Sequence, residues 1–260
     1  MRDAAGHDIN YMSRSGIISH AGRAKTGPSL MNVQIADIAV GSLNSVIGIL
    51  AAVYHREKTG SGQYIDVSML DGCVPFNSLD GAEFLVSGRQ PRREGELLNG
   101  GSMYDYYETS DGEYMSVGPL EPKFWENFCR ILEREDLIEG TVRPEDPEEV
   151  KEQLRKIFKT KTKVEWTEAF SDKDTCVQPV LDLTEALLED PQIRAREMVV
   201  DVDLPLHEDI KVKQMASPIK LECTPCEYRF AGYPLGYHTR EIIEALGLDY
   251  EELLCKKVFD

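Results

Sequence analysis

The sequence has no long uninterrupted hydrophobic run, and it is short of basic residues relative to acidic ones. Its longest apolar run, residues 46–54, is far shorter than the roughly 20 residues that a membrane-spanning helix needs, so we expect no membrane span. The 29 lysines and arginines against 46 aspartates and glutamates give a net charge of −17. This charge repels phosphate backbones and anionic lipid surfaces, so nucleic acid is not an expected partner.

Cysteines are also few: the six in the chain are scattered and predict no disulfide framework. Cys223 and Cys226 have the spacing of a zinc or redox pair. A zinc site needs four ligands and no second pair of suitable spacing follows, so we interpret them as two unlinked thiols and expect no metal. The first residues lack the apolar core of a secretory signal, which favours a cytoplasmic protein.

What the chain does contain is enough apolar sequence, 42% of 260 residues, to bury one sizeable core or two smaller ones. Apolar residues are dense on most faces of a predicted helix at 37–56. Glycines at 60 and 62 end it and lead into a predicted strand at 63–70. A buried helix followed by a buried strand indicates an α/β fold.

Composition divides the rest of the chain. Residues 87–102 are polar and rich in glycine and arginine, which predicts a linker, and a second, small domain is expected to begin beyond it. The pair Asp111-Gly112 predicts a hairpin of strands at 103–109 and 113–118. The apolar pattern further predicts helices at 71–86, 123–133, 147–160, 163–170, 183–188 and 239–246, and strands at 199–206 and 211–221.

Three titratable residues stand at predicted element boundaries. His7 lies in the polar stretch 6–11, where an imidazole can act as acid or base, although histidines in such loops are often ordinary surface residues. Asp37 begins the apolar helix, which suits either a helix cap or a base near the positive end of the helix dipole. Glu121, between two prolines, is either a first-turn glutamate or a functional carboxylate. The sequence does not show that these residues meet.

Several motifs resemble the 2-methylacyl-CoA racemases of the family III CoA-transferase (CaiB/BaiF) group. Gly-His-Asp-Ile-Asn-Tyr at 6–11 resembles the catalytic-histidine motif of these enzymes, and Asp37 falls at their catalytic aspartate. Residues 118–124 resemble the segment whose glutamate pairs with the histidine. Further similar stretches are residues 59–66, 111–118 and 235–239.

The resemblance implies an isomerase that moves the α-proton of a 2-methylacyl-CoA through an enolate. His7, oriented by Glu121, would serve one face of the enolate and Asp37 the other. The residues implied to contact the substrate or its coenzyme A are Gly6, Asp8, Ile9, Asn10 and Tyr11. No cofactor is implied apart from the coenzyme A of the substrate. The resemblance also implies that residues 1–86 are the remainder of a large α/β domain, the back half of a Rossmann-like one, followed by a linker at 87–102. It implies a small α+β domain at 103–225, a C-terminal segment at 226–260 that returns to the large domain, and an interlocked homodimer with sites formed between domains of different chains.

Two alternatives remain open. A CoA transferase of the same family would use Asp37 as a nucleophile and pass through an aspartyl-CoA thioester. The chain also begins just after the N-terminal part that the family resemblance implies, so it is expected to be N-terminally incomplete. A non-catalytic fragment or a subunit that needs a separate N-terminal chain is therefore the second alternative. Arg89, Arg92 and Arg93 form a compact basic cluster, which we interpret as a solvated loop in preference to a phosphate site.

Overall fold

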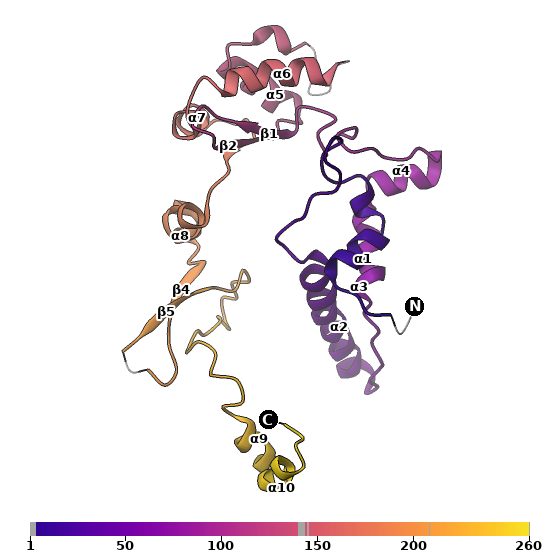
Figure 1. Cartoon of the computed structure of the whole chain (residues 1–260), viewed down its shortest axis with the longest axis vertical. Coiled ribbons are helices and arrows are strands. Elements are labelled where there is room, and N and C mark those ends of the chain that lie inside the picture. The colour runs from indigo at the N-terminus through magenta and orange to yellow at the C-terminus, as the bar shows by residue number, and fades with distance from the viewer. Residues whose placement is uncertain (1–3, 140–143, 145, 208, 260) are drawn as a thin grey trace. The chain divides into compact units, whose positions relative to one another are not determined.

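A computed structural model describes residues 4–139, 144, 146–207 and 209–259. The contacts divide the chain into two compact units, one ending at Val180 and the other beginning at Leu181 (Figure 1). This division falls inside the segment predicted as a small domain, whose family-based boundaries stay a prediction.

The first part of unit one is helical. Its elements are α1 (Asp8–Arg14), η1 (Ile17–Ser19), η2 (Ala36–Leu43), α2 (Asn44–Thr59), α3 (Met69–Cys73), η3 (Val74–Asn77) and α4 (Asp80–Ser87). A small core joins them, formed by the buried side chains of Met12, Ala36, Val40 and Cys73. This core packs α1 and α3 against η2, so the loop that carries His7 and the helix that carries Asp37 belong to one folded cluster.

The strand predicted at 63–70 is not formed. Residues 61–68 have no regular structure, and α3 begins at Met69. Ser68 caps this helix, because its hydroxyl oxygen accepts a hydrogen bond from the Asp71 amide. The alternation of Tyr64, Ile65 and Val67 suits a strand, but a strand also needs a neighbour to pair its backbone groups. No such neighbour lies beside this segment in the part of the chain that the structure describes, so the prediction is wrong.

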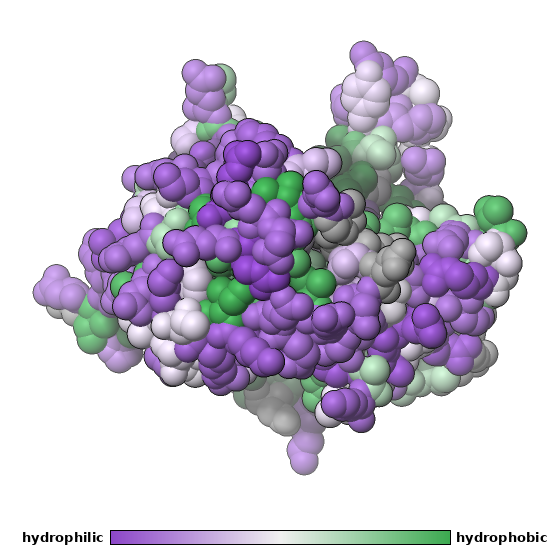
Figure 2. All heavy atoms as spheres, turned by 90° about the horizontal axis from the view of Figure 1, so that it is seen from above, coloured by the Kyte–Doolittle hydropathy of each residue, from purple (hydrophilic) through white to green (hydrophobic). Residues whose placement is uncertain are grey.

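The helix predicted at 37–56 is longer than expected. In the described chain, η2 and α2 form one continuous helical stretch, Ala36–Thr59, of 24 residues, long and apolar enough by length and composition to cross a membrane. On its own, one such helix is weak evidence for a membrane span. The helix was also expected to be buried, and that expectation is wrong, because only 11% of its apolar window is buried in the described chain. Figure 2 shows that hydrophobic residues are exposed among the hydrophilic ones on the face in view.

The second part of unit one is the predicted hairpin with helices around it. Strands β1 (Asp105–Glu108), β2 (Tyr114–Val117) and β3 (Val177–Pro179) form an antiparallel sheet in the order β1-β2-β3. Its remaining elements are α5 (Pro122–Ile131), η4 (Glu135–Leu137), α6 (Pro147–Phe158) and α7 (Lys163–Phe170). Their aromatic side chains build the larger core, in which Phe158 stacks on Tyr107 with ring centroids 5.1 Å apart.

Unit two is smaller. It contains η5 (Glu185–Glu189), α8 (Pro191–Ala195), the antiparallel pair β4 (Val199–Asp203) and β5 (Lys211–Met215), α9 (Thr239–Ala245) and α10 (Tyr250–Cys255). The strands predicted at 199–206 and 211–221 are confirmed in their first halves. Mixed helices and strands over the two units confirm the α/β class.

Candidate active site

His7 and Asp37 stand at the beginnings of two helices that one carboxylate joins. His7 is the residue before α1, and its backbone amide donates to Asn10 Oδ1 at 3.0 Å. The carboxylate of Asp8 accepts the Ala36 amide at 2.6 Å and the Asp37 amide at 3.3 Å. Because Asp8 follows His7 directly, this contact links the His7 segment to the first turn of η2.

The chemistry of the Asp37 position follows from this helix start. Asp37 is the second residue of η2, where unpaired backbone amides and the helix dipole favour negative charge. Its side chain is exposed and, within the described part of the chain, has no hydrogen-bond or ion-pair partner. The prediction that Asp37 lies near the positive end of a helix is confirmed. The Asp8 contact uses two of the amides, so Asp8 and not Asp37 is the capping carboxylate.

The short motif around His7 is a helix and not the loop that its polarity suggested. Gly6 leaves room for the Tyr11 side chain, because a Cβ at this glycine would lie 2.9 Å from both Cζ and Oη of Tyr11. Tyr11 Oη donates to the Gly6 carbonyl at 3.4 Å. Gly6, Asn10 and Tyr11, expected to contact substrate, therefore also form the turn that presents His7. Asp8 has its own structural role, described above.

Glu121 lies in the second part of unit one. It is the residue before α5, its backbone is extended, and Pro122 opens the helix. The pKa of the Cys176 thiol is raised, first by burial and then by the negative charge of Glu121, so the two side chains are near one another. In the described residues, Glu121 shares no hydrogen bond or ion pair with His7 or Asp37. The structure thus links the segments that carry His7 and Asp37 within one chain, and it places Glu121 in the other part of unit one.

Two cavities of unit one adjoin these residues. The first, of about 270 Å³, lies beside α1 and includes Asp8 in its wall. The second, of about 600 Å³, includes Gly118 and Cys176, close to Glu121. Met31 lines both cavities, so the space beside Asp8 and the space near Glu121 are neighbours.

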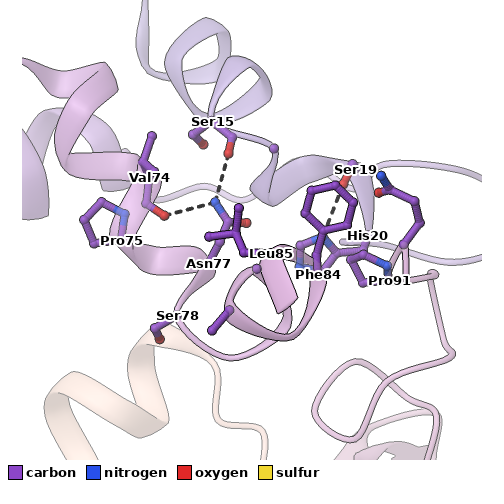
Figure 3. Close-up of a pocket in the computed structure, with 14 residues that line it drawn as sticks. Ser15, Ser19, His20, Val74, Pro75, Asn77, Ser78, Phe84, Leu85 and Pro91 are labelled. Carbon is purple, nitrogen blue, oxygen red and sulfur yellow. Dashed lines mark hydrogen bonds between the residues drawn. The ribbon is translucent and has the colours of Figure 1, made fainter. Parts of the chain in front are cut away.

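A third cavity, of about 470 Å³, lies between the end of α1 and the α3–α4 region (Figure 3). Its walls are largely apolar, and Asn77 crosses it to donate to the Ser15 carbonyl at 2.9 Å. His20 accepts or donates at Ser19 Oγ at 3.2 Å and lies 3.5 Å from an Asp80 oxygen. In the described chain, its lining includes none of the three predicted catalytic residues, and it also lacks Asp8, Gly118 and Cys176, which line the other two cavities.

The basic cluster at 89–93 is tied into the protein. Arg89 forms ion pairs with Glu83 at 2.7 Å and with Glu96 at 2.8 Å. Arg93 donates from Nε to the Ala21 carbonyl at 2.8 Å. These contacts explain why arginines gather in this loop without a phosphate ligand. Arg89 and Arg92 are exposed, as expected of a solvated loop.

The residue that sequence reasoning missed is Arg23. Its guanidinium donates to both carboxylate oxygens of Asp105 at 2.7 and 3.1 Å and to Glu94 at 3.0 Å. Asp105 also pairs with the buried Lys151 at 2.5 Å. This network joins the 21–27 turn to the β1 strand. No sequence signal connects residues that are 82 positions apart.

The chain has known relatives over nearly its whole length. The sequence matches CoA-transferase family III over residues 1–239. It is 34% identical over 252 residues to the human alpha-methylacyl-CoA racemase, covering 96% of this chain and 64% of that protein. It is 30% identical over 256 residues to the succinyl-CoA:mesaconate CoA-transferase of Haloarcula marismortui, covering 93% of this chain and 61% of that one.

The fold has solved counterparts. A crystal structure of a CaiB/BaiF family protein from Brucella suis superposes with a TM-score of 0.76 at 23% identity, covering 94% of this chain and 64% of that one. The chain thus spans less than two thirds of the length of these relatives. The match over residues 1–239 and the 34% identity to the racemase show that the chain belongs to CoA-transferase family III.

Proposed function

We propose that this chain carries the catalytic residues of a racemase for 2-methylacyl-CoA thioesters. The thioester carbonyl acidifies the hydrogen on the adjacent carbon, and removal of that proton gives a planar enolate. His7 takes the proton from one face and Asp37 returns a proton to the other, with the roles exchanged for the opposite enantiomer. The result is inversion at the α-carbon with no net change in composition.

The observation that carries this proposal is the pair of Asp8 contacts to the Ala36 and Asp37 amides. They connect the segment that carries the His7 imidazole to the helix start that carries the Asp37 carboxylate. Proton transfer on both faces of one carbon requires two such groups. The positive end of the η2 helix dipole also favours the negative charge of an enolate. The 34% identity to an alpha-methylacyl-CoA racemase supports the same reaction.

We further propose that Glu121 acts on His7 from a second copy of the chain. Glu121 is exposed at the start of α5 and contacts neither His7 nor Asp37 within the described part of its own chain. A homodimer that places this carboxylate against the imidazole of the partner would orient His7 and raise its proton affinity.

The alternative reaction is CoA transfer through Asp37. Its carboxylate would attack the thioester carbonyl to give an anhydride and free coenzyme A thiolate. The thiolate would then attack the aspartyl carbonyl of that anhydride, which gives an aspartyl-CoA thioester and releases the donor acid as its carboxylate. The 30% identity to a CoA-transferase supports this alternative, whereas it leaves His7 without a role. A third possibility, a subunit that needs a further polypeptide to become active, is consistent with the 64% coverage of the racemase.

The test is to incubate the purified chain in heavy water with a single enantiomer of a 2-methylacyl-CoA and follow the α-hydrogen by NMR. Racemisation predicts that deuterium enters as optical purity falls, and that Asp37→Asn and His7→Ala each abolish the inversion. Asp66→Asn and His55→Ala are matched controls, because these are the same residue types, exposed and remote from α1 in sequence.

The contrary results are also specific. A coenzyme A adduct on the peptide that contains Asp37, detected by mass spectrometry without deuterium incorporation, would establish the transferase instead. A folded chain that shows neither exchange nor adduct until a further polypeptide is added would establish the subunit.

A further inference from the structure

A serine, a histidine and an aspartate form a chain of contacts beside the third cavity. Ser19 Oγ lies 3.2 Å from His20 Nδ1, and Asp80 Oδ2 lies 3.5 Å from His20 Nε2. Ser19 and His20 line the cavity of about 470 Å³, and a dashed line in Figure 3 marks their contact. The two ring nitrogens of His20 therefore face two different side chains, a hydroxyl and a carboxylate.

The carboxylate determines which nitrogen of His20 carries the proton. A carboxylate only accepts hydrogen bonds, so the nitrogen that faces Asp80, Nε2, is the protonated one in the neutral imidazole. Nδ1 is then the acceptor, and the Ser19 hydroxyl donates to it. A hydroxyl that donates to an imidazole, which a carboxylate orients in turn, is the arrangement that activates a serine as a nucleophile.

The burial of the three side chains suits these roles. The side chains of His20 and Asp80 are only 14% and 20% exposed. Water therefore screens their interaction less than at an open surface, and Asp80 stabilises a positive charge on the imidazole more strongly. Ser19 is exposed, so a substrate can reach its hydroxyl from solvent.

Two amide groups of this region are available to a developing oxyanion. In the described chain, the backbone amide of His20 donates to no backbone carbonyl. The amide of the residue that follows a nucleophilic serine is a common oxyanion donor. Gln90 also lines the cavity, and its side-chain amide has no hydrogen-bond partner among the described residues. An amide of this kind can stabilise the negative oxygen of a tetrahedral intermediate.

The walls of the cavity indicate the class of substrate. Its volume is typical of a site for a small molecule, and Val74, Phe84 and Leu85 give it an apolar lining. Asn77 uses its amide to donate to two backbone carbonyls. In the described chain no lysine, arginine, aspartate or glutamate lines the cavity, so a charged acyl group would find no counter-charge there. An uncharged, apolar acyl group fits.

We propose that this cavity is a second active site, a serine esterase for small uncharged carboxylic esters. Ser19 Oγ bonds to the carbonyl carbon as its proton passes to His20 Nδ1, and the alcohol leaves with that proton. Water then attacks the acyl-serine ester and gives a proton to His20, which returns it to Ser19 as the acid leaves. The sum is ester and water to acid and alcohol. This activity is independent of the proposed racemase.

Hydrolysis of p-nitrophenyl butyrate by the purified chain tests the nucleophile and the base. We expect release of p-nitrophenol, which Ser19→Ala should abolish and His20→Gln should slow at least about a hundredfold. Ser78→Ala is the matched control, because Ser78 lines the same cavity and forms no hydrogen bond to an imidazole in the described chain. Its rate should stay within about twofold of wild type. No release by the wild-type chain, or release that persists in Ser19→Ala, would overturn the esterase.

Asp80 is a positioning residue, because it acts through His20. Asp80→Asn should slow hydrolysis, and Asp80→Glu, which keeps the carboxylate, should be faster than Asp80→Asn. Equal rates in these two variants would overturn the role of Asp80.

Two covalent probes test the site without an ester substrate. A fluorophosphonate should label the tryptic peptide 15–23, and fragmentation should place the label on Ser19 and not on Ser15. In Ser19→Cys, the imidazole should lower the pKa of the introduced thiol, so iodoacetamide should alkylate it faster than the exposed Cys255. Adding His20→Gln should remove that advantage. A phosphonate on another serine, or an introduced thiol that reacts no faster than Cys255, would overturn the proposal.

Discussion

The Asp8 carboxylate caps the helix that begins at Ala36, with its oxygen 2.6 Å from the Ala36 amide. The two residues are 28 positions apart, and the contact is the direct hydrogen-bonded connection between the His7 segment and the Asp37 helix start. A capping carboxylate satisfies backbone amides that would otherwise be unpaired, and its charge is favourable at a helix N-terminus. The same bond therefore stabilises the fold and positions the two proposed bases.

This dual role predicts that Asp8→Asn weakens catalysis more than stability. An asparagine side chain can still accept the amides, so we expect an unfolding free energy lower by at most about 1 kcal/mol. Loss of the charge and of the bond geometry should shift His7 relative to Asp37, and a small misplacement can reduce the rate about a hundredfold. Urea denaturation and α-proton exchange measure the two effects. Equal activity in Asp8→Asn and wild type would show that Asp8 does not position the bases.

The aromatic core of unit one predicts a large stability change for Phe158→Ala. Phe158 is fully buried and stacks on Tyr107, Phe128, Trp166 and Phe170. Truncation of a buried phenylalanine leaves a cavity and costs about 3–5 kcal/mol. The chain has two tryptophans, both in this core, so their fluorescence during urea denaturation reports its unfolding. Tyr64→Ala, at a 91% exposed aromatic residue, should leave the free energy of unfolding within about 0.5 kcal/mol of wild type.

The Asp105 network predicts a loss of stability in acid. Burial alone would raise the pKa of Asp105, but hydrogen bonds from Arg23 and Lys151 outweigh it and hold this pKa below its ordinary value. A carboxyl with a lowered pKa in the folded state contributes stability above its unfolded pKa, about 3.9. That contribution is lost as the pH falls through the folded value. We therefore expect stability to be retained at neutral pH and to fall below about pH 4.

Two variants isolate this contribution. Asp105→Asn leaves Lys151, which is 1% exposed, without its counter-charge, and removal of one partner of a buried pair costs about 3–5 kcal/mol at neutral pH. The double variant Asp105→Asn with Lys151→Met removes both charges and should recover much of that loss, because no buried charge remains unpaired. Urea denaturation at neutral and acidic pH measures both. An unchanged acid dependence in the double variant would mean that other carboxylates govern it.

Part of the fold could be predicted because the signals were local. The pair Asp111-Gly112 marks the β1–β2 hairpin, and helix α7 spans the predicted residues 163–170. The prediction of a strand at 63–70 was wrong, because alternation of apolar and polar residues indicates which side chains would share a face. It does not indicate whether another strand is available to pair with. Helix α1 was missed because a polar helix of seven residues has no apolar stripe long enough to recognise.

The candidate site also has a part that local sequence signals predict and a part that depends on packing. His7, Asp37 and Glu121 could be singled out from motifs, since each lies at a boundary that the sequence marks. Their catalytic roles stay predictions. The bond from Asp8 to the η2 amides and the Arg23–Asp105 pair could not be predicted, because they join residues far apart in the chain and depend on the packing of elements that periodicity alone does not place.

The last prediction concerns the packing behind Asp37. Gly72, in α3, faces Val40 of η2, and a Cβ at Gly72 would lie 2.2 Å from Val40 Cγ1. Val40 is fully buried and β-branched, so it cannot turn away, and Gly72→Ala must push η2 from α3. We expect a cost of about 1–3 kcal/mol from overpacking and a loss of exchange activity, because Asp37 lies on the displaced helix. The second substitution Val40→Ala removes the clashing methyl, so the double variant should regain stability and activity relative to Gly72→Ala alone. If Val40→Ala instead adds its own loss to that of Gly72→Ala, close contact between these two helices is not what holds Asp37 in place.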